Sequence, residues 1–314
     1  MSAAFENQHR ATMKGHSRMN DIRQRGPAPA KALVLGGGGP VGASWEAMVL
    51  LELGTAGLSA ADCDVVVGTS AGAIVGAWLT MRPHGLAALP DRMRERAAWH
   101  ADRATNGRSD RDKLTRLLAK KSEAGAPSMV AIAQAAVEAE PPLSTAEAEA
   151  LWKLGSPEGS WPRNLAMASV NVKTGEAHTW SADDEIPVAV GIACSTAAPG
   201  VAPAVDAAGA VWVDGGVRSA TNADLILNAA NGHGDLLPSG GKVLIVACRP
   251  ADDIARENSI LTQHGYDVRV LVSDPYYQKP ADLLDSRFID AATEAGRQQG
   301  RKAAGDLKAW WNEQ

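Results

Sequence analysis

A serine between glycines is the residue of this chain best suited to nucleophilic chemistry. Ser70 lies within Gly68-Thr-Ser-Ala-Gly72, after an apolar run at 64–67 and before the apolar segment 73–79. A strand, a tight turn and a helix in this order are typical of a nucleophile elbow, which exposes a hydroxyl above a sheet. The glycines fit because a side chain would crowd the turn. The positive end of the following helix dipole favours an oxyanion near the serine.

A glycine-rich loop could supply the hydrogen-bond donors that such a nucleophile needs. An ester or amide hydrolase requires a nucleophile, a base and donors for the oxyanion. Residues 36–42 read Gly-Gly-Gly-Gly-Pro-Val-Gly, so the first four carry no side chain. Their bare N–H groups can approach a developing negative oxygen closely, and losing one such donor typically costs on the order of a hundredfold in rate.

The same loop also fits a different class of protein. Residues 37–42 match the dinucleotide fingerprint G-x-G-x-x-G, which is a weak signal alone. A Rossmann site also needs an acidic residue at the end of the next strand. Glu52 lies in the predicted helix, however, and Asp62 and Asp64 precede the second strand. A nucleotide-binding oxidoreductase stays open as an alternative, and stabilisation by NAD(P) in a thermal melt would support it.

The candidates for the general base that would activate Ser70 are two histidines and a carboxylate. His233 and His264 follow in polar loops without a motif, where histidines are usually bystanders. Asp214 ends a short apolar strand and precedes Gly215 and Gly216, so its carboxylate can emerge at a sheet edge. A carboxylate within hydrogen-bond reach can orient and deprotonate a serine. The alternative for Asp214 is an ordinary Asp-Gly turn.

The elements around these residues predict a parallel sheet covered by helices. A strand at 31–35, a helix at 43–53 stopped by Gly54, a strand at 64–67 and the helix after Ser70 alternate along the chain. Residues 82 to about 155 predict a helical insertion, with helix starts at 109–112 and 144–147. Further elements are expected as strands at 165–172, 176–180, 211–213, 242–248 and 266–272, helices at 187–195 and 282–311, and an extended loop at 196–203.

Charge and composition favour a protein that does not bind nucleic acid. The formal net charge is −5, which argues against a basic nucleic-acid surface. Residues 1–31 hold six Lys and Arg against two acidic residues, an excess of four positive charges. We expect residues 1–30 to be a disordered basic arm and residues 31–314 to form a single domain. The six basic residues counted over residues 1–31 are Arg10, Lys14, Arg18, Arg23, Arg25 and Lys31.

The chain also lacks the marks of export or of a disulfide framework. It has no signal-peptide core and no apolar stretch of bilayer length. Cys63, Cys194 and Cys248 are an odd count without metal-type spacing, which predicts reduced, buried side chains. These features predict a cytoplasmic protein.

Taken in order, the motifs resemble those of the patatin-like phospholipases. They are the glycine loop at 37–42, the elbow at 68–72 and the late Asp214-Gly-Gly216. Residues 195–203 also resemble the Ser-x-Ala-x-Pro loop that precedes this Asp-Gly-Gly element in the family. The likeness spans roughly residues 31 to 250, and the ordered set is far more specific than any one motif.

The resemblance implies a three-layer α/β/α sandwich and hydrolysis of acyl esters by a Ser–Asp dyad. Ser70 would be the nucleophile, Asp214 would activate it, and the N–H groups of Gly37, Gly38 and Gly39 would form the oxyanion hole. It implies no metal or organic cofactor. The expected partner is a lipid or another acyl ester, with transient contact with a membrane.

Two features bear on the substrate. The family's glycine loop often carries Lys or Arg just before its last glycine, where this chain has Val41. This departure motivates an alternative, a catalytically weak lipid- or acyl-binding protein of the same fold. The chain also has nine Trp, which suit membrane interfaces but more often pack in cores. Trp310 and Trp311 are the candidates for contact with lipid or a second subunit.

Overall fold

The computed structural model describes residues 29–60, 63–105, 112–120, 127–227 and 235–313. The expected arm at 1–28, the helix start at 109–111, Asp62 and His233 lie outside these residues.

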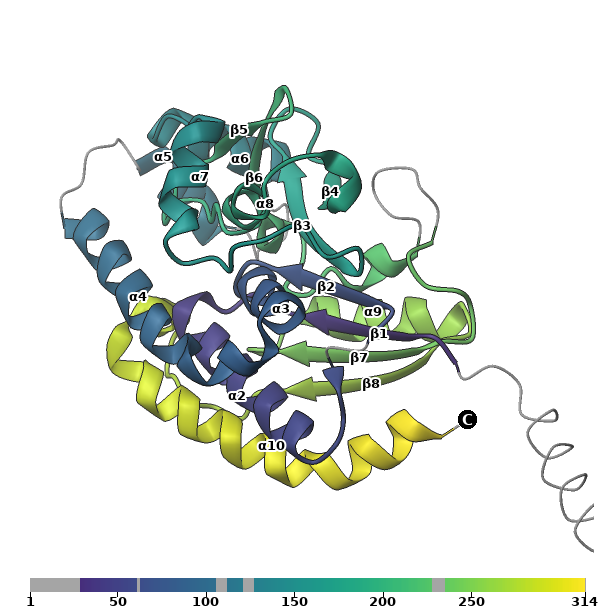
Figure 1. Cartoon of the computed structure of the whole chain (residues 1–314). Coiled ribbons are helices and arrows are strands. Elements are labelled where there is room, and N and C mark those ends of the chain that lie inside the picture. Colours follow the sequence, from purple (N-terminus) through teal and green to yellow (C-terminus); the bar gives the residue numbers. More distant parts are fainter. Residues whose placement is uncertain (1–28, 61–62, 106–111, 121–126, 228–234, 314) are drawn as a thin grey trace, which may run out of the picture.

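A mixed, mostly parallel sheet of eight strands forms the centre of the molecule (Figure 1). Its strands follow the order β5-β6-β3-β2-β1-β7-β8, and β4 adds to β3. The parallel strands are β1 (Lys31–Leu35), β2 (Val65–Thr69), β3 (Leu165–Asn171), β7 (Lys242–Ala247) and β8 (Asp267–Val272). The antiparallel strands are β4 (Ala177–Trp180), β5 (Val205–Ala207) and β6 (Ala210–Asp214).

Helices cover both faces of this sheet, as the alternation of buried residues in β1 requires. Leu33 and Leu35 pack in one core with α2 (Gly39–Thr55) and α10 (Ile289–Asn312). Ala32 and Val34 pack on the other face with residues of α9 (Asp252–Gln263) (Figure 1). The predicted α/β/α sandwich is confirmed.

The described part of residues 82–155 is largely helical. It contains α4 (Leu89–Thr105), α5 (Asp112–Ala119), α6 (Met129–Ala139) and α7 (Thr145–Lys153), after α3 (Ala71–Met81). The capping box at Ser144 is present, because the Ser144 N–H donates to Glu147 Oε2 at 2.9 Å. That these helices form an insertion within a single domain stays a prediction.

Several boundaries differ from those expected. Helix α2 begins at Gly39, four residues early, because Pro40 is tolerated in a first turn, and it runs through Gly54. Helix α10 begins at Ile289, since residues 280–288 form short 3₁₀ turns. The predicted helix at 187–195 is α8 (Val188–Ser195). Helix α9 and strand β5 were not predicted.

Helix α10 lies unusually close to α2. A Cβ at Gly296 would lie 2.4 Å from the Trp45 carbonyl oxygen, and one at Gly300 would lie 2.9 Å from that of Val49. These glycines therefore let the two backbones approach, which fixes the C-terminal helix on the core.

The tryptophan pair at the end of α10 is buried, which corrects the idea that it contacts lipid or another subunit. Trp310 and Trp311 are 4% and 3% exposed. The Trp310 indole donates to Asp267 Oδ2 at 2.6 Å, and Lys242 Nζ lies over its ring. The pair thus ties α10 to the sheet, and the alternative interpretation, helix packing, is the correct one.

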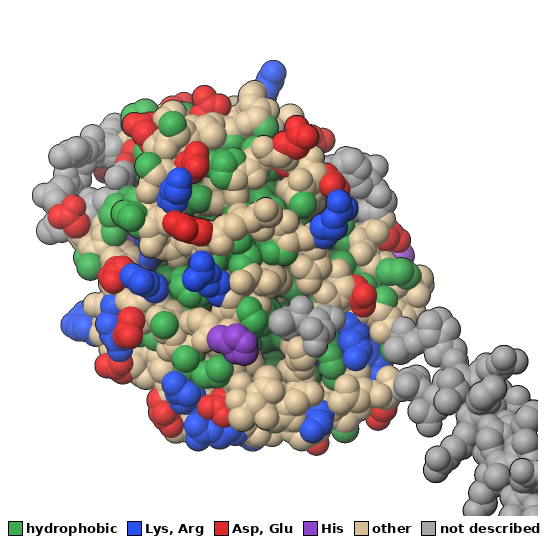
Figure 2. Space-filling view, in the orientation of Figure 1, with side chains coloured by type: hydrophobic (Ala, Val, Ile, Leu, Met, Phe, Trp, Pro, Cys, Tyr) green, Lys and Arg blue, Asp and Glu red, His purple; other side chains and the backbone are tan. Residues whose placement is uncertain are grey.

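The three cysteines are buried and free, as predicted. Acidic and basic side chains are interspersed over the face shown in Figure 2. Within the described residues, we find no helix that has both the length and the apolar character needed to span a bilayer.

Candidate active site

Ser70 lies at a strained turn that only glycine neighbours permit. It follows β2 directly, with φ 55° and ψ −113°, a conformation that costs energy for a residue with a side chain. A Cβ at Gly72 would lie 2.2 Å from the Leu35 carbonyl oxygen, and one at Gly68 would lie 2.5 Å from that of Gly72. The predicted elbow is present, and steric exclusion explains its two glycines.

The elbow is held by the end of α8. The Ser70 N–H donates to Ser195 Oγ at 3.0 Å, and Ser195 is fully buried. The loop that resembles Ser-x-Ala-x-Pro therefore contacts Ser70 directly, a role that the sequence alone did not indicate.

Strand β3 brings Ser70 and Asp214 together. Thr69 of β2 pairs with Ala168, and Asp214 of β6 pairs with Ser169, the next residue of β3. Strands β2 and β6 thus end at neighbouring positions along β3. Two residues that are distant in the sequence reach one place in the sheet by this pairing.

The backbone around Asp214 is fixed on both sides. Its N–H donates to the Ala197 carbonyl at 3.0 Å, and its Oδ1 accepts from the Gly216 N–H at 2.6 Å. A Cβ at Gly215 would lie 2.7 Å from the Ala168 carbonyl oxygen. Asp214 is 3% exposed and lines the cavity described below.

Asn222 joins strand β2, which ends next to Ser70, to the loop after Asp214. It is fully buried and has φ 52°. Its Nδ2 donates to Thr69 Oγ1 at 3.2 Å, to the Gly215 carbonyl at 3.1 Å and to the Ser219 carbonyl at 3.0 Å. One amide therefore holds the residue before Ser70 and the residue after Asp214.

Charged side chains also stabilise the loop after Asp214. Glu257 accepts hydrogen bonds from the Thr221 hydroxyl and from the Ala223 N–H. Burial raises the pKa of Glu257. Arg218 pairs with Asp224. Burial alone would raise the pKa of Asp224, but the hydrogen bond and the charge of Arg218, together with smaller contributions from Glu257 and Arg256, lower that pKa.

Two backbone N–H groups of the glycine loop are hydrogen-bonded within the protein, and two are not. The Gly37 N–H donates to the Ala220 carbonyl at 2.8 Å, and the Gly36 N–H donates to Val246 O at 3.0 Å. Within the described residues, the N–H groups of Gly38 and Gly39 have no hydrogen-bond acceptor. These two lie at the start of α2, where the helix leaves its first amides unpaired.

A buried carboxyl lies behind this loop. Glu46 of α2 is fully buried, and its Oε1 accepts from the Gly36 N–H at 2.8 Å. Burial raises the pKa of Glu46 well above its ordinary value, although hydrogen bonds with Cys248 and Gly36 oppose the rise. The raised pKa favours the neutral form of this carboxyl, which adds no negative charge behind the free amides.

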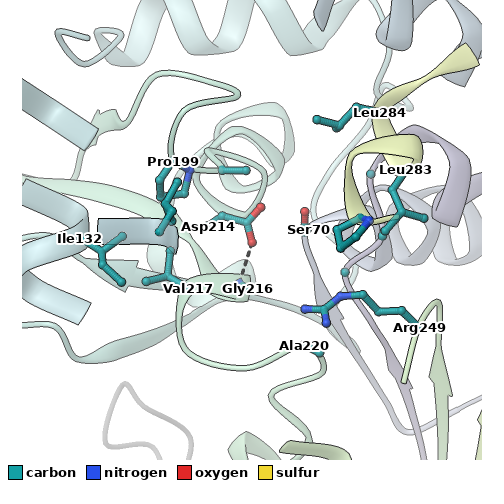
Figure 3. A pocket seen from close by; sticks show the side chains of 16 residues that line it. Ser70, Ile132, Pro199, Asp214, Gly216, Val217, Ala220, Arg249, Leu283 and Leu284 are labelled. Carbon is teal, nitrogen blue, oxygen red and sulfur yellow. Dashed lines mark hydrogen bonds between the residues drawn. The ribbon is translucent and has the colours of Figure 1, made fainter. Parts of the chain in front are cut away.

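A cavity of about 250 Å³ unites these groups. The glycine loop, Ser70 and Asp214 all line it, and Figure 3 shows the serine hydroxyl and the carboxylate facing one another across it. The other lining residues are Leu118, Ile132, Ala198, Pro199, Gly216, Val217, Ala220, Arg249, Pro280, Leu283 and Leu284. A smaller cavity of about 90 Å³, lined by Trp152 and His100 among others, also reaches Ser70.

Two further sequence expectations concern residues around this cavity. His264 lies exposed at the end of α9, where its Nδ1 bonds to the Ile260 carbonyl, and it does not line the cavity. Val41 is fully buried in α2. Arg249 was missed, although its place after a clear parallel strand was a signal, because ligands bind beyond the carboxyl ends of such strands.

The fold and the site define an α/β protein with a serine elbow and a glycine loop beyond adjacent parallel strands. The model of the family described as patatin-like phospholipase matches residues 33–227, more than half of the chain. The chain belongs to this family, which implies lipid acyl hydrolase activity.

Two solved structures that this chain matches come from bacteria. VipD from Legionella pneumophila has a TM-score of 0.38 and 13% identity, over 88% of this chain and 67% of VipD. ExoU, in its complex with SpcU from Pseudomonas aeruginosa, has a TM-score of 0.40 and 18% identity, over 86% of this chain. The present chain spans about half, 52%, of the length of the solved chain that it matches. No curated protein sequence matches this chain.

Proposed function

We propose that the protein hydrolyses lipid acyl esters through Ser70 and Asp214. The observation that carries this proposal is the single cavity that the elbow serine, the buried carboxylate and the glycine loop line together. Family membership supports a lipid ester as the substrate.

In the proposed mechanism, Ser70 Oγ attacks the ester carbonyl carbon while the Asp214 carboxylate takes its proton. The N–H groups of Gly38 and Gly39 hold the resulting oxyanion. Gly37 was also expected to donate, but its N–H already binds Ala220, so we assign it to the support of the loop. The protonated Asp214 then gives its proton to the leaving alcohol. Asp214 next deprotonates a water molecule, whose oxygen attacks the acyl carbonyl carbon. The bond to Ser70 Oγ then breaks, Asp214 returns the proton to Ser70, and the carboxylic acid leaves.

The test compares wild type, Ser70→Ala and Asp214→Asn on esters of short and medium acyl chains. We expect no acyl-enzyme from Ser70→Ala, and a rate loss on the order of 10²- to 10⁴-fold for Asp214→Asn, the usual contribution of a general base. Labelling by a fluorophosphonate probe should require Ser70. Equal rates in all three proteins would refute the proposal.

The same two substitutions at exposed positions outside the cavity serve as controls. Ser259 and Asp306 are exposed residues on α9 and α10, away from the cavity. Ser259→Ala and Asp306→Asn should leave both hydrolysis and labelling unchanged. The alternative function, a binding protein without catalysis, predicts instead that Ser70 stays unlabelled in the wild type.

A further inference from the structure

Arg249 is a charged residue of the cavity that the proposed chemistry does not use. It follows Cys248 at the carboxyl end of β7 and is half-buried. Of the described residues that line the cavity, Ser70, Asp214 and Arg249 carry the polar side chains, and the rest are glycine or apolar. A cation therefore lies in a largely apolar wall beside the nucleophile.

The guanidinium group has no protein partner among the described residues, neither an ion pair nor a hydrogen bond. Arg218, on the loop after Asp214, differs, because Asp224 pairs with it. A partly desolvated guanidinium is costly unless an anion meets its donors. An anionic ligand in the cavity would supply what the chain does not.

The sheet places this charge beside the glycine loop. Leu35 of β1 pairs with Val246 of β7, so the two strands end next to one another. A Cβ at Gly38 would lie 2.4 Å from Cys248 Cβ, which shows how closely the residue before Arg249 approaches the loop. The loop itself carries no charge, because Val41 is apolar and buried.

The two sides of the cavity differ in charge. Figure 3 shows the apolar side chains of Ile132, Pro199 and Val217 beside Asp214. On the opposite side, Arg249 lies with Leu283 and Leu284, and its side chain extends toward Ser70 and Ala220. A ligand that fits both ends is amphipathic, with an apolar chain at one end and an anionic group at the other.

We propose that Arg249 binds a phosphate group of the substrate, so that the preferred substrate is an acylated glycerol with a phosphate on its alcohol part. This inference rests on the proposed hydrolase function. The planar fork of Arg matches phosphate oxygens in a bidentate manner, whereas Lys offers a point charge. The acyl chain lies against the apolar end and the phosphate lies beside Arg249, with the ester between them at Ser70.

The kinetic test compares two esters with the same acyl chain, 1-acylglycerol 3-phosphate and 1-acylglycerol. The measured quantity is the ratio of kcat/KM for the phosphate ester to that for the neutral ester. Arg249→Gln should lower this ratio by about tenfold or more, since hydrogen bonds between ionised groups are the strong ones. Arg249→Lys should lower it less.

Arg163→Gln is the matched control, because Arg163 is exposed and lies outside the cavity. It removes the same charge and should leave the ratio unchanged. An unchanged ratio in Arg249→Gln, or an equal fall in Arg163→Gln, overturns the inference.

A binding test separates this inference from the hydrolase proposal. In a Ser70→Ala background, decyl phosphate should raise the melting temperature more than decanol does, and adding Arg249→Gln should abolish the difference. Inorganic phosphate alone should have little effect. Equal shifts with both decyl compounds, or a full shift with inorganic phosphate, contradict a lipid phosphate site. If wild type hydrolyses neither ester, the hydrolase proposal fails, and the melting shifts still decide the role of Arg249.

Discussion

The two halves of the proposed dyad are held in place in different ways. Around Ser70, backbone lies against backbone, and a Cβ at Gly68 or Gly72 would lie within 2.5 Å of a carbonyl oxygen. Around Asp214, the loop is held largely by side chains, with Asn222 and Glu257 at the centre. The turn at Ser70 thus depends mainly on the absence of side chains at Gly68 and Gly72, whereas the loop after Asp214 depends in addition on the hydrogen bonds of Asn222 and Glu257.

Substitution of an elbow glycine should have the largest effect. In Gly72→Ala the new Cβ would lie 2.2 Å from the Leu35 carbonyl oxygen, which is backbone and cannot move aside cheaply. We expect a loss of about 3 kcal/mol or more in the free energy of unfolding, at the upper end for overpacking. Urea denaturation measures this loss, and fluorophosphonate labelling should fall with it.

Gly305→Ala is the control for this substitution. Gly305 is exposed within α10 and has no heavy atom within 4 Å of an added Cβ among the described residues. The change should stabilise the protein by up to about 1 kcal/mol, the difference in helix propensity. A similar destabilisation at both positions would argue against steric exclusion at the elbow.

Removal of the Asn222 amide should affect rate more than stability. Asn222→Ala breaks the hydrogen bonds to Thr69 and Gly215, so the serine and the carboxylate can drift apart. We expect kcat to fall on the order of 100-fold, as for displacements near 1 Å, and a loss of about 2 kcal/mol in the free energy of unfolding.

The variant Asn222→Gly distinguishes the effect of the lost amide from the effect of backbone strain at this position. Glycine adopts the φ of 52° without strain, yet it lacks the amide. It should recover stability relative to Asn222→Ala without recovering kcat. Full recovery of kcat would mean that backbone conformation, and not the amide, positions the dyad.

The smallest expected effect concerns pH. Two buried carboxyl groups lie near the proposed dyad, Glu46 behind the glycine loop and Glu257 behind the loop after Asp214. Burial raises the pKa of each above its ordinary value of 4.5. The folded protein therefore holds these protons more tightly than the unfolded chain does. The resulting stability is complete below about pH 4.5 and is lost as pH rises through the raised pKa values.

Glu46→Gln and Glu257→Gln should both flatten the fall in the free energy of unfolding from about pH 5 upward, as measured by urea titration at several pH values. If the free energy of unfolding of Glu46→Gln fell with pH as steeply as that of the wild type, the Glu46 carboxyl would not govern the pH dependence.

This contrast explains what could be predicted from the sequence. The elbow, the glycine loop and the parallel strands were predicted, because steric demands and apolar runs leave local patterns. Asn222 and Ser195 were missed as positioning residues, because their hydrogen bonds connect distant segments and no local spacing marks them. The start of α2 at Gly39 was missed because four consecutive glycines predict a loop more strongly than a first helical turn.

The pairing of β3 with both β2 and β6 also has a consequence for the order of folding. Ser70 and Asp214 come from strands separated by several helices and by β3 itself, and closing so long a loop is slow. Catalytic competence should therefore be the last property to return on refolding, after the sheet has added β6. If the proposed dyad is correct, a growing chain cannot assemble it until Asp214 has been synthesised and β6 has paired with β3.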